Sequence, residues 1–204
     1  MRSARSKTDF GVVTYDHSQS RSKRLFTFGR LSFLIALAVT LVLQNQAAAK
    51  EAGEYEVKAA FLYNFAKFIE WPSNVSPGPN APMVIGILGK DPFGGEIDRA
   101  VAGKTVNGRR LLIKRFSTLE SYEYCHILFV SASERSNLPR ILAAVANSSV
   151  LTVSETERFA QIGGIINFTT IESRIRFEIN QAAAERAGLK ISSKLLSLGR
   201  AIRT

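Results

Sequence analysis

The sequence is poor in the residues that staple small proteins, hold zinc or perform nucleophilic catalysis. Cys125 is the only cysteine of the 204 residues, so no intrachain disulfide can form. His126 is the only histidine after the first 49 residues, and one His with one Cys gives too few ligands for a zinc site. No G-x-S-x-G, H-E-x-x-H or P-loop lysine motif occurs. We therefore expect a protein that is not an enzyme, with no catalytic residue, no metal and no cofactor.

Excess charge is also absent from most of the chain, although the formal net charge is +10. Residues 1–49 carry half of this excess, and residues 50–185 are neutral, with fifteen charges of each sign. A nucleic-acid-binding domain carries its basic excess on the body of the domain, so the distribution excludes nucleic acid as a partner. The other half of the excess is matched by five C-terminal residues: Arg186, Lys190, Lys194, Arg200 and Arg203.

No apolar run is long enough to span a membrane as a helix. The longest, Leu31–Leu43, has thirteen residues, whereas a spanning helix needs about 20. Basic residues precede this run and Ala47–Ala49 follows it, which is the pattern of a secretory signal peptide. We predict export to the periplasm, cleavage after Ala49 and a single mature domain over residues 50–204. The alternative to a cleaved signal peptide is an uncleaved membrane anchor. The thirty residues before the apolar run make a long leader, which indicates that translation starts downstream of Met1.

The mature chain alternates apolar runs with amphipathic stretches. Because buried parallel strands read as continuous apolar runs and helices separate them, the pattern predicts an α/β fold. We expect a single three-layer sandwich with a mostly parallel sheet, an antiparallel hairpin edge and flanking helices. The expected strands cover residues 83–88, 110–116, 126–130, 150–153, 165–168 and 174–179, with the hairpin turn near 171–173.

The first and last helices carry the most pronounced periodicity. From Glu54 to Trp71 the spacing of Val57, Phe61, Phe65 and Phe68 predicts a helix with an apolar face, which Pro72 ends. Further expected helices cover about 96–101, 133–146 and 181–187. A last helix is expected from Ser192 or Ser193, with an apolar face that extends to Ile202 and the C-terminal basic residues opposite.

Several segments have the composition of a binding site, each with a plainer structural interpretation. The loop Gly89–Gly95 follows a strand and precedes a helix, where backbone N–H groups meet anions, but a tight turn explains its glycines more simply. Arg174 and Arg176 are two residues apart on an expected strand, so they share one face. Together they could clamp a phosphate or carboxylate; the plainer interpretation is a solvated or salt-bridged edge strand. Trp71 is either a stacking residue or core, and Cys125 is best interpreted as a small buried hydrophobe.

Three blocks of this sequence resemble the YfiR family of bacterial periplasmic proteins. They are Tyr63–Pro72 (YNFAKFIEWP), Phe159–Phe168 (FAQIGGIINF), and Arg174–Asn180 (RIRFEIN) with Ala187–Leu196 (AGLKISSKLL). The resemblance implies an α/β sandwich that forms dimers. It also implies a non-enzymatic repressor that binds the periplasmic region of a membrane-bound diguanylate cyclase and so lowers cyclic-di-GMP signalling and biofilm formation. An OmpA-like outer-membrane lipoprotein is implied as a partner that sequesters the repressor.

The resemblance also implies candidate ligand-binding residues. Relatives are associated with small aromatic or nucleotide-like ligands near the last hairpin. By this resemblance Arg174, Arg176 and Trp71 are the candidate ligand-binding residues. Well-known relatives have cysteine pairs linked to redox control, and this chain, with Cys125 alone, cannot form such a pair within itself. A periplasmic module that senses a small ligand is therefore the alternative to the repressor.

Overall fold

The computed structural model describes residues 52–75, 78 and 81–202, which all belong to one compact unit, Ala49–Thr204. The predicted signal peptide lies outside these residues. Within the described residues no helix is long and apolar enough to cross a membrane.

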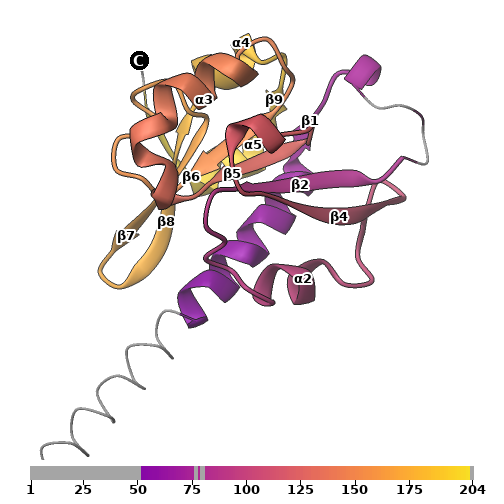
Figure 1. Ribbon diagram of the computed structural model, residues 1–204, viewed down its shortest axis with the longest axis horizontal. Helices are drawn as coiled ribbons and strands as arrows, with labels where there is room; N and C mark the ends of the chain where they lie inside the picture. Colours follow the sequence, from indigo (N-terminus) through magenta and orange to yellow (C-terminus); the bar gives the residue numbers. More distant parts are fainter. Residues whose placement is uncertain (1–51, 76–77, 79–80, 203–204) are drawn as a thin grey trace, which may run out of the picture. The chain divides into compact units, whose positions relative to one another are not determined.

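An eight-stranded sheet forms the centre of the domain (Figure 1), in the order β10-β8-β7-β6-β5-β2-β4-β3. Its inner strands β4, β2, β5, β6 and β7 are parallel, and β3 and β8 run antiparallel to their neighbours β4 and β7. The expected mostly parallel sheet with an antiparallel hairpin is confirmed. The strand bounds are β2 Met83–Leu88, β3 Thr105–Val106, β4 Arg109–Phe116, β5 Ile127–Val130, β6 Leu151–Ser154, β7 Ile166–Ile171, β8 Arg174–Asn180 and β10 Arg200–Ile202.

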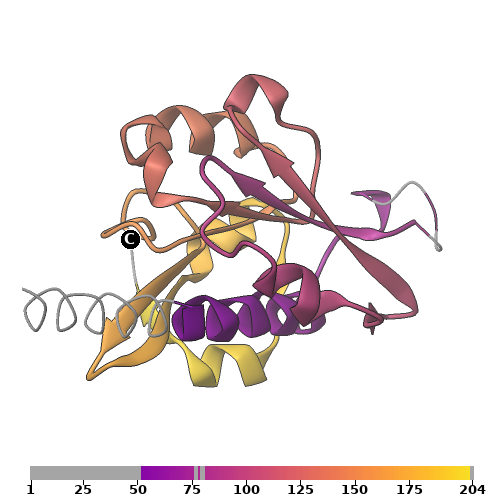
Figure 2. The same cartoon turned by 60° about the horizontal axis from the view of Figure 1, so that its bottom comes forward.

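Helices cover both faces of the sheet, which confirms the three-layer sandwich (Figure 2). One face packs against the helix of residues 52–68, α2 (Glu96–Val101) and α5 (Ser193–Leu198). The other face packs against α3 (Leu138–Val145). Side chains of β5 alternate between the two clusters, with Ile127 and Phe129 in the first and Leu128 and Val130 in the second. This alternation is the period of two that a strand imposes, so an unbroken apolar run is required when both faces are covered.

The hairpin β7–β8 forms where it was expected. Glu172 and Ser173 connect the strands with φ of +50° and +60°, the left-handed conformation that a two-residue hairpin turn requires. Asn167 lies opposite Glu178, and Thr169 lies opposite Arg176. These four residues therefore share one face of the hairpin.

The C-terminal segment differs from its prediction. The last helix, α5, ends at Leu198, and Arg200–Ile202 forms strand β10, parallel to β8. Consequently the predicted basic helix does not exist, since Lys190 lies in a strand and Arg200 in β10. The physical reason is close approach: a Cβ on Gly199 would lie 2.6 Å from the Phe177 ring, so glycine lets the chain fold back onto β8 and pair with its edge.

Shorter elements complete the domain. A two-stranded antiparallel ribbon joins β1 (Ile69–Glu70) to β9 (Lys190–Ile191), which brings the end of the 52–68 helix beside the C-terminal region. Helix α4 (Gln181–Arg186) follows β8, and its N-cap is Asn180, whose side chain accepts a hydrogen bond from the Ala183 N–H. Short 3₁₀ turns occupy Ser73–Val75, Leu119–Ser121 and Ala132–Asn137, the last within the stretch predicted as the start of α3.

The buried face of the 52–68 helix is rotated from the predicted one. Val57 is 44% exposed, and the fully buried positions include Leu62, Phe65 and Ala66. Lys58 is only 4% exposed, so a charged side chain lies on the buried side of this helix. The shift follows from the aromatic contacts: the Phe65 ring stacks with Phe168 at 5.8 Å and meets Phe177 edge-on at 5.2 Å.

We predict that Phe65→Ala destabilises the domain by about 3–5 kcal/mol, because it removes a ring that is fully buried and leaves a cavity. Urea unfolding followed by circular dichroism measures the change. Val57→Ala, on the exposed face of the same helix, is the control and should cost less than about 1 kcal/mol. Equal losses for the two variants would contradict the assigned face.

Candidate functional site

Ligands of open parallel sheets bind outside the carboxyl ends of the strands, where the strand order reverses. In this sheet the order reverses between β2 and β5, since the chain goes from β2 to β4 on one side and from β5 to β6 on the other. The rule therefore predicts a ligand site at the carboxyl ends of β2 and β5.

The glycine loop after β2 is a tight turn whose amides are used within the protein. Gly89 has φ of +90°, and a Cβ there would lie 2.5 Å from the Ser133 hydroxyl oxygen. The Lys90 N–H donates to that same oxygen at 2.9 Å, and the Phe93 N–H donates to Asp91 at 2.7 Å. Since these donors are committed and a carboxylate lies in the loop, the geometry favours the turn interpretation over an anion site.

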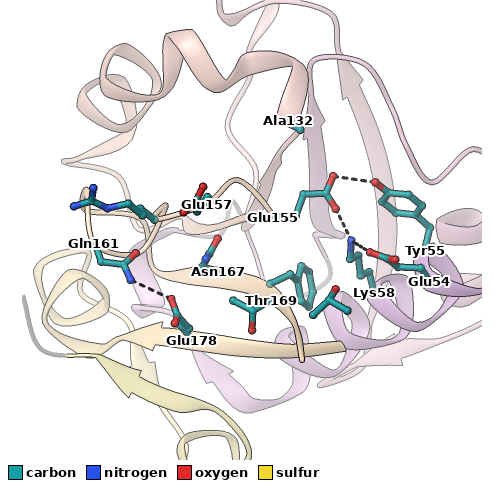
Figure 3. Close-up of a pocket in the computed structure, with 13 residues that line it drawn as sticks. Glu54, Tyr55, Lys58, Ala132, Glu155, Glu157, Gln161, Asn167, Thr169 and Glu178 are labelled. Carbon is teal, nitrogen blue, oxygen red and sulfur yellow. Dashed lines mark hydrogen bonds and ion pairs between the residues drawn. The ribbon is translucent and has the colours of Figure 1, made fainter. Parts of the chain in front are cut away.

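An open pocket of about 660 Å³ lies beside the carboxyl ends of β5 and β6 (Figure 3). Its walls come from the start of the 52–68 helix, the segments that follow β5 and β6, and the hairpin β7–β8. The lining residues are Glu54, Tyr55, Lys58, Ala132, Glu155, Glu157, Arg158, Gln161, Asn167, Phe168, Thr169, Thr170 and Glu178.

One wall of the pocket is a buried ion-pair cluster. The Lys58 ammonium lies 2.5 Å from carboxylate oxygens of both Glu54 and Glu155. The Tyr55 hydroxyl donates to the other oxygen of Glu155 at 2.9 Å. A buried ammonium must be paired to remain charged, so this cluster binds the helix to the carboxyl end of β6.

The opposite wall combines Glu178 with Asn167. Glu178 is 4% exposed and accepts from the Arg200 guanidinium and, at 3.3 Å, from the Gln161 amide. Asn167 lies directly across the hairpin from Glu178 and is 2% exposed. Its side-chain oxygen is buried without a hydrogen-bond partner in the described part of the chain.

The two predicted arginines lie beside this pocket. Arg174 and Arg176 are both exposed and share the strand face of Glu178. Arg176 is opposite Thr169, which lines the pocket, so its place is at the outer end of the same hairpin face. Among residues 52–75, 78 and 81–202 neither guanidinium has an ion-pair partner, and both remain available to a ligand or a partner protein.

The third predicted residue, Trp71, is not brought to the arginines. Its indole N–H donates to the His126 carbonyl oxygen at 3.2 Å, at the amino end of β5. Counted along neighbouring strands in register, Asn167 lies four residues beyond His126, and Thr169 lies two residues beyond Asn167. His126, which holds Trp71, and Thr169, which is opposite Arg176, are therefore separated by roughly 20 Å along the strands. Trp71 contributes to a different region, beside a second pocket lined in part by Pro72 and Arg109.

His126 is held as a neutral structural residue. Its Nδ1 accepts the Val84 N–H at 3.1 Å, and its Nε2 lies 3.0 Å from the Arg109 guanidinium. Burial, and secondly the Arg109 charge, lower the pKa of His126 to about 4. Because a neutral imidazole has a single acceptor nitrogen and Nδ1 accepts the Val84 N–H, the ring is not positioned as a general base.

Cys125 and the acidic residues give no sign of redox or metal chemistry. Cys125 is fully buried, and burial raises the pKa of its thiol to about 12, so the reactive thiolate is scarce. No group of three or more His, Cys, Asp or Glu side chains in the described residues could hold a metal ion.

The pocket was not predicted from the sequence, because its walls come from four separate segments of the chain. Lys58 and Glu155 are 97 positions apart. The available signal was Lys58 itself, a lysine beside the apolar face of a helix, and Asn167, a polar residue within an apolar run. Neither position shows which partner it meets.

The YfiR/HmsC-like family model matches residues 55–200. Curated protein sequences gave no match.

Two solved structures are similar in part. One is the ABC domain from Streptococcus pneumonia in complex with L-Trp, with a TM-score of 0.44 and 12% identity over 59% of this chain and 55% of that one. The other is a conserved domain protein from Vibrio cholerae O1 biovar El Tor strain N16961, with a TM-score of 0.45 and 12% identity over 59% of this chain and 54% of that one. This chain thus spans just over half the length of each of those chains.

The pKa of His126 predicts acid sensitivity. The pKa of His126 in the folded protein is lower than its unfolded value near 6.5. The contribution of His126 to the stability of the fold is therefore fully present above about pH 6.5 and is lost as the pH falls toward 4. Between about pH 7.5 and pH 4.5 the loss from this residue is about 2 kcal/mol. His126→Asn keeps an acceptor for the Val84 N–H and removes the titrating ring, so its melting temperature should fall less over the same interval. An identical fall in both proteins would contradict the assignment.

Cys125 should be unreactive in the folded protein. We expect dithionitrobenzoate to modify one thiol per chain in urea, at a rate more than about a hundredfold above the native rate, because unfolding restores water access and thiolate. Absorbance of the released thionitrobenzoate measures both rates, with Cys125→Ala as the blank. Rapid modification of the native protein would overturn the buried-hydrophobe interpretation.

Proposed function

This chain belongs to the YfiR/HmsC-like family, and from that membership we propose an exported, non-enzymatic repressor of a membrane-bound diguanylate cyclase. The family supports a regulator of a diguanylate cyclase in general. The finer proposal is that the domain binds the periplasmic region of the cyclase and lowers cyclic-di-GMP production and biofilm formation. The match over residues 55–200, nearly the whole described domain, is the observation that carries it.

The chemistry of the nucleophilic and basic side chains supports a regulator over an enzyme. The Cys125 thiol is buried with a raised pKa, and the Nδ1 of His126 accepts the Val84 N–H while its Nε2 lies beside Arg109. A nucleophile and base in a catalytic arrangement lie within hydrogen-bond reach of each other and of a substrate. These two residues have structural roles instead.

The end of the hairpin has the composition of a protein-contact surface. Ile171 is 53% exposed and lies opposite Arg174, with Arg176 two residues further along the same strand. The hairpin extends away from the rest of the sheet (Figure 1). Arginine next to exposed apolar area is enriched at interfaces, so we place the cyclase contact here.

The remaining parts of the proposal concern export and assembly. Residues 1–49 act as a cleaved signal peptide in this scheme, and N-terminal sequencing of exported protein should begin at Lys50. A homodimer and sequestration by an OmpA-like outer-membrane lipoprotein complete the proposal. Neither needs a cofactor.

A periplasmic module that senses a small ligand is the second candidate function. The pocket beside the carboxyl ends of β5 and β6, with Arg176 at the outer end of the hairpin that forms one of its walls, is the observation that favours it. The two functions are compatible, because a bound ligand at the hairpin can alter the surface that meets the cyclase.

Deleting the gene should raise cellular cyclic-di-GMP, measured by mass spectrometry, and the full-length gene in trans should restore the basal level. A gene that lacks codons 2–49 keeps its product in the cytoplasm and should not restore it. Unchanged cyclic-di-GMP and unchanged surface attachment after deletion would refute the repressor function.

The contact surface is tested by charge reversal in the same strain. Arg176→Glu should leave the protein folded and fail to restore the basal level, because it replaces the exposed cation of the hairpin with an anion. Arg110→Glu is the matched control, another exposed arginine on a strand, β4, and should restore it fully. Equal restoration by both variants would move the contact away from the hairpin.

A further inference from the structure

The pocket beside the carboxyl ends of β5 and β6 is built to receive a hydrogen-bond donor that carries positive charge. We propose that it binds a small organic ammonium ion, and that an N–H of this ion donates to the side-chain oxygen of Asn167. This site is distinct from the exposed arginines, and the proposal does not depend on how the cyclase is regulated.

Asn167 is the residue that points to a ligand. Its side-chain oxygen is buried, the residue is 2% exposed, and no donor among the described residues reaches that oxygen. Buried polar atoms in folded proteins almost always have a partner, because the loss of hydration is otherwise uncompensated. Figure 3 shows the Asn167 side chain between Glu155 and Glu157 on one side and Glu178 and Thr169 on the other.

Three donors in these walls, Lys58, Gln161 and Arg200, are already committed to carboxylates. The Lys58 ammonium serves Glu54 and Glu155. The Gln161 amide and the Arg200 guanidinium both donate to Glu178. Satisfying Asn167 from these three groups would break an ion pair or hydrogen bond, and no other described donor reaches its oxygen, which leaves the position open to a ligand N–H.

The charge of the walls selects a cation. Four glutamates line the pocket, against the lining cations Lys58 and Arg158 and the Arg200 guanidinium that pairs with Glu178, which leaves one negative charge in excess. Carboxylates accept hydrogen bonds and repel anions, which disfavours a phosphate or carboxylate ligand at this depth. A metal ion is disfavoured as well, because no three acidic or His side chains among the described residues converge on one point.

The size and the apolar part of the pocket favour an organic cation. The volume of about 660 Å³ is within the range of small-molecule sites, which span roughly 300–1,000 Å³. Phe168 and Ala132 supply apolar surface. An alkyl chain with a terminal ammonium group matches both kinds of surface.

The proposal is tested by titration of protein purified after expression of the full chain. We expect 1,4-diaminobutane to bind with one-to-one stoichiometry by isothermal titration calorimetry. Tetramethylammonium has the charge without an N–H donor and should bind at least about tenfold more weakly, which is about 1.4 kcal/mol. Succinate, a dianion of the same chain length, should not bind. No heat with the diamine, or equal affinity for tetramethylammonium, would overturn the proposal.

Variants at Asn167 separate ligand binding from a structural role. Asn167→Leu removes the acceptor and should weaken diamine binding at least about tenfold, with an unchanged or higher melting temperature, because the unpaired buried oxygen is gone. Asn167→Asp keeps an acceptor and adds charge, so it should bind at least as tightly as the original. Asn147→Leu, the same change at an exposed asparagine outside this pocket, should bind normally.

A measurement on the unchanged protein covers the case in which a variant fails to fold. In a ¹⁵N-correlated NMR titration, the Asn167 side-chain amide signals should shift saturably with diamine, while those of Asn147 stay constant. Diamine binding that leaves the Asn167 signals unmoved, or that survives Asn167→Leu at full strength, would overturn the assignment.

Discussion

The structure depends on the burial of the aromatic face of the 52–68 helix against the β7–β8 hairpin. Phe61 and Phe65 on the helix meet Phe177 on β8 at ring distances of 5.4 and 5.2 Å, and Phe65 also stacks on Phe168 of β7. Aromatic rings bury large areas and prefer a few mutual orientations, so this contact sets both the position and the rotation of the helix. The rotation in turn places Lys58 inward, beside Glu155.

Buried charge explains why the C-terminal segment folds back onto the sheet. Glu178 would be an unpaired carboxylate at 4% exposure without the guanidinium of Arg200, which β10 brings to its side. The glycine at position 199 permits that return, because a side chain there would collide with Phe177. A charge that looks like part of a basic tail in the sequence thus neutralises an acid in the wall of the pocket.

Local patterns were sufficient for the elements whose neighbours are close in sequence. The runs at Met83–Leu88 and Ile127–Val130 are apolar throughout, and a strand covered on both faces requires this pattern. The turn at Glu172–Ser173 was located by the alternation on either side of it. The last helix was extended too far because Ile202 continues the helical spacing, and the spacing carries no information about the edge of β8 that competes for residues 200–202.

The amino-acid sequence by itself determined the fold class, the family, the inert character of Cys125 and the shared face of Arg174 and Arg176, because each depends on composition or on short-range periodicity. The tertiary structure alone decided that Trp71 lies far from those arginines and that Lys58, Glu155, Asn167 and Glu178 surround one pocket. The physical reason is that a pocket is made by side chains from segments up to about a hundred residues apart, and only the packing of the helix on the sheet brings them together.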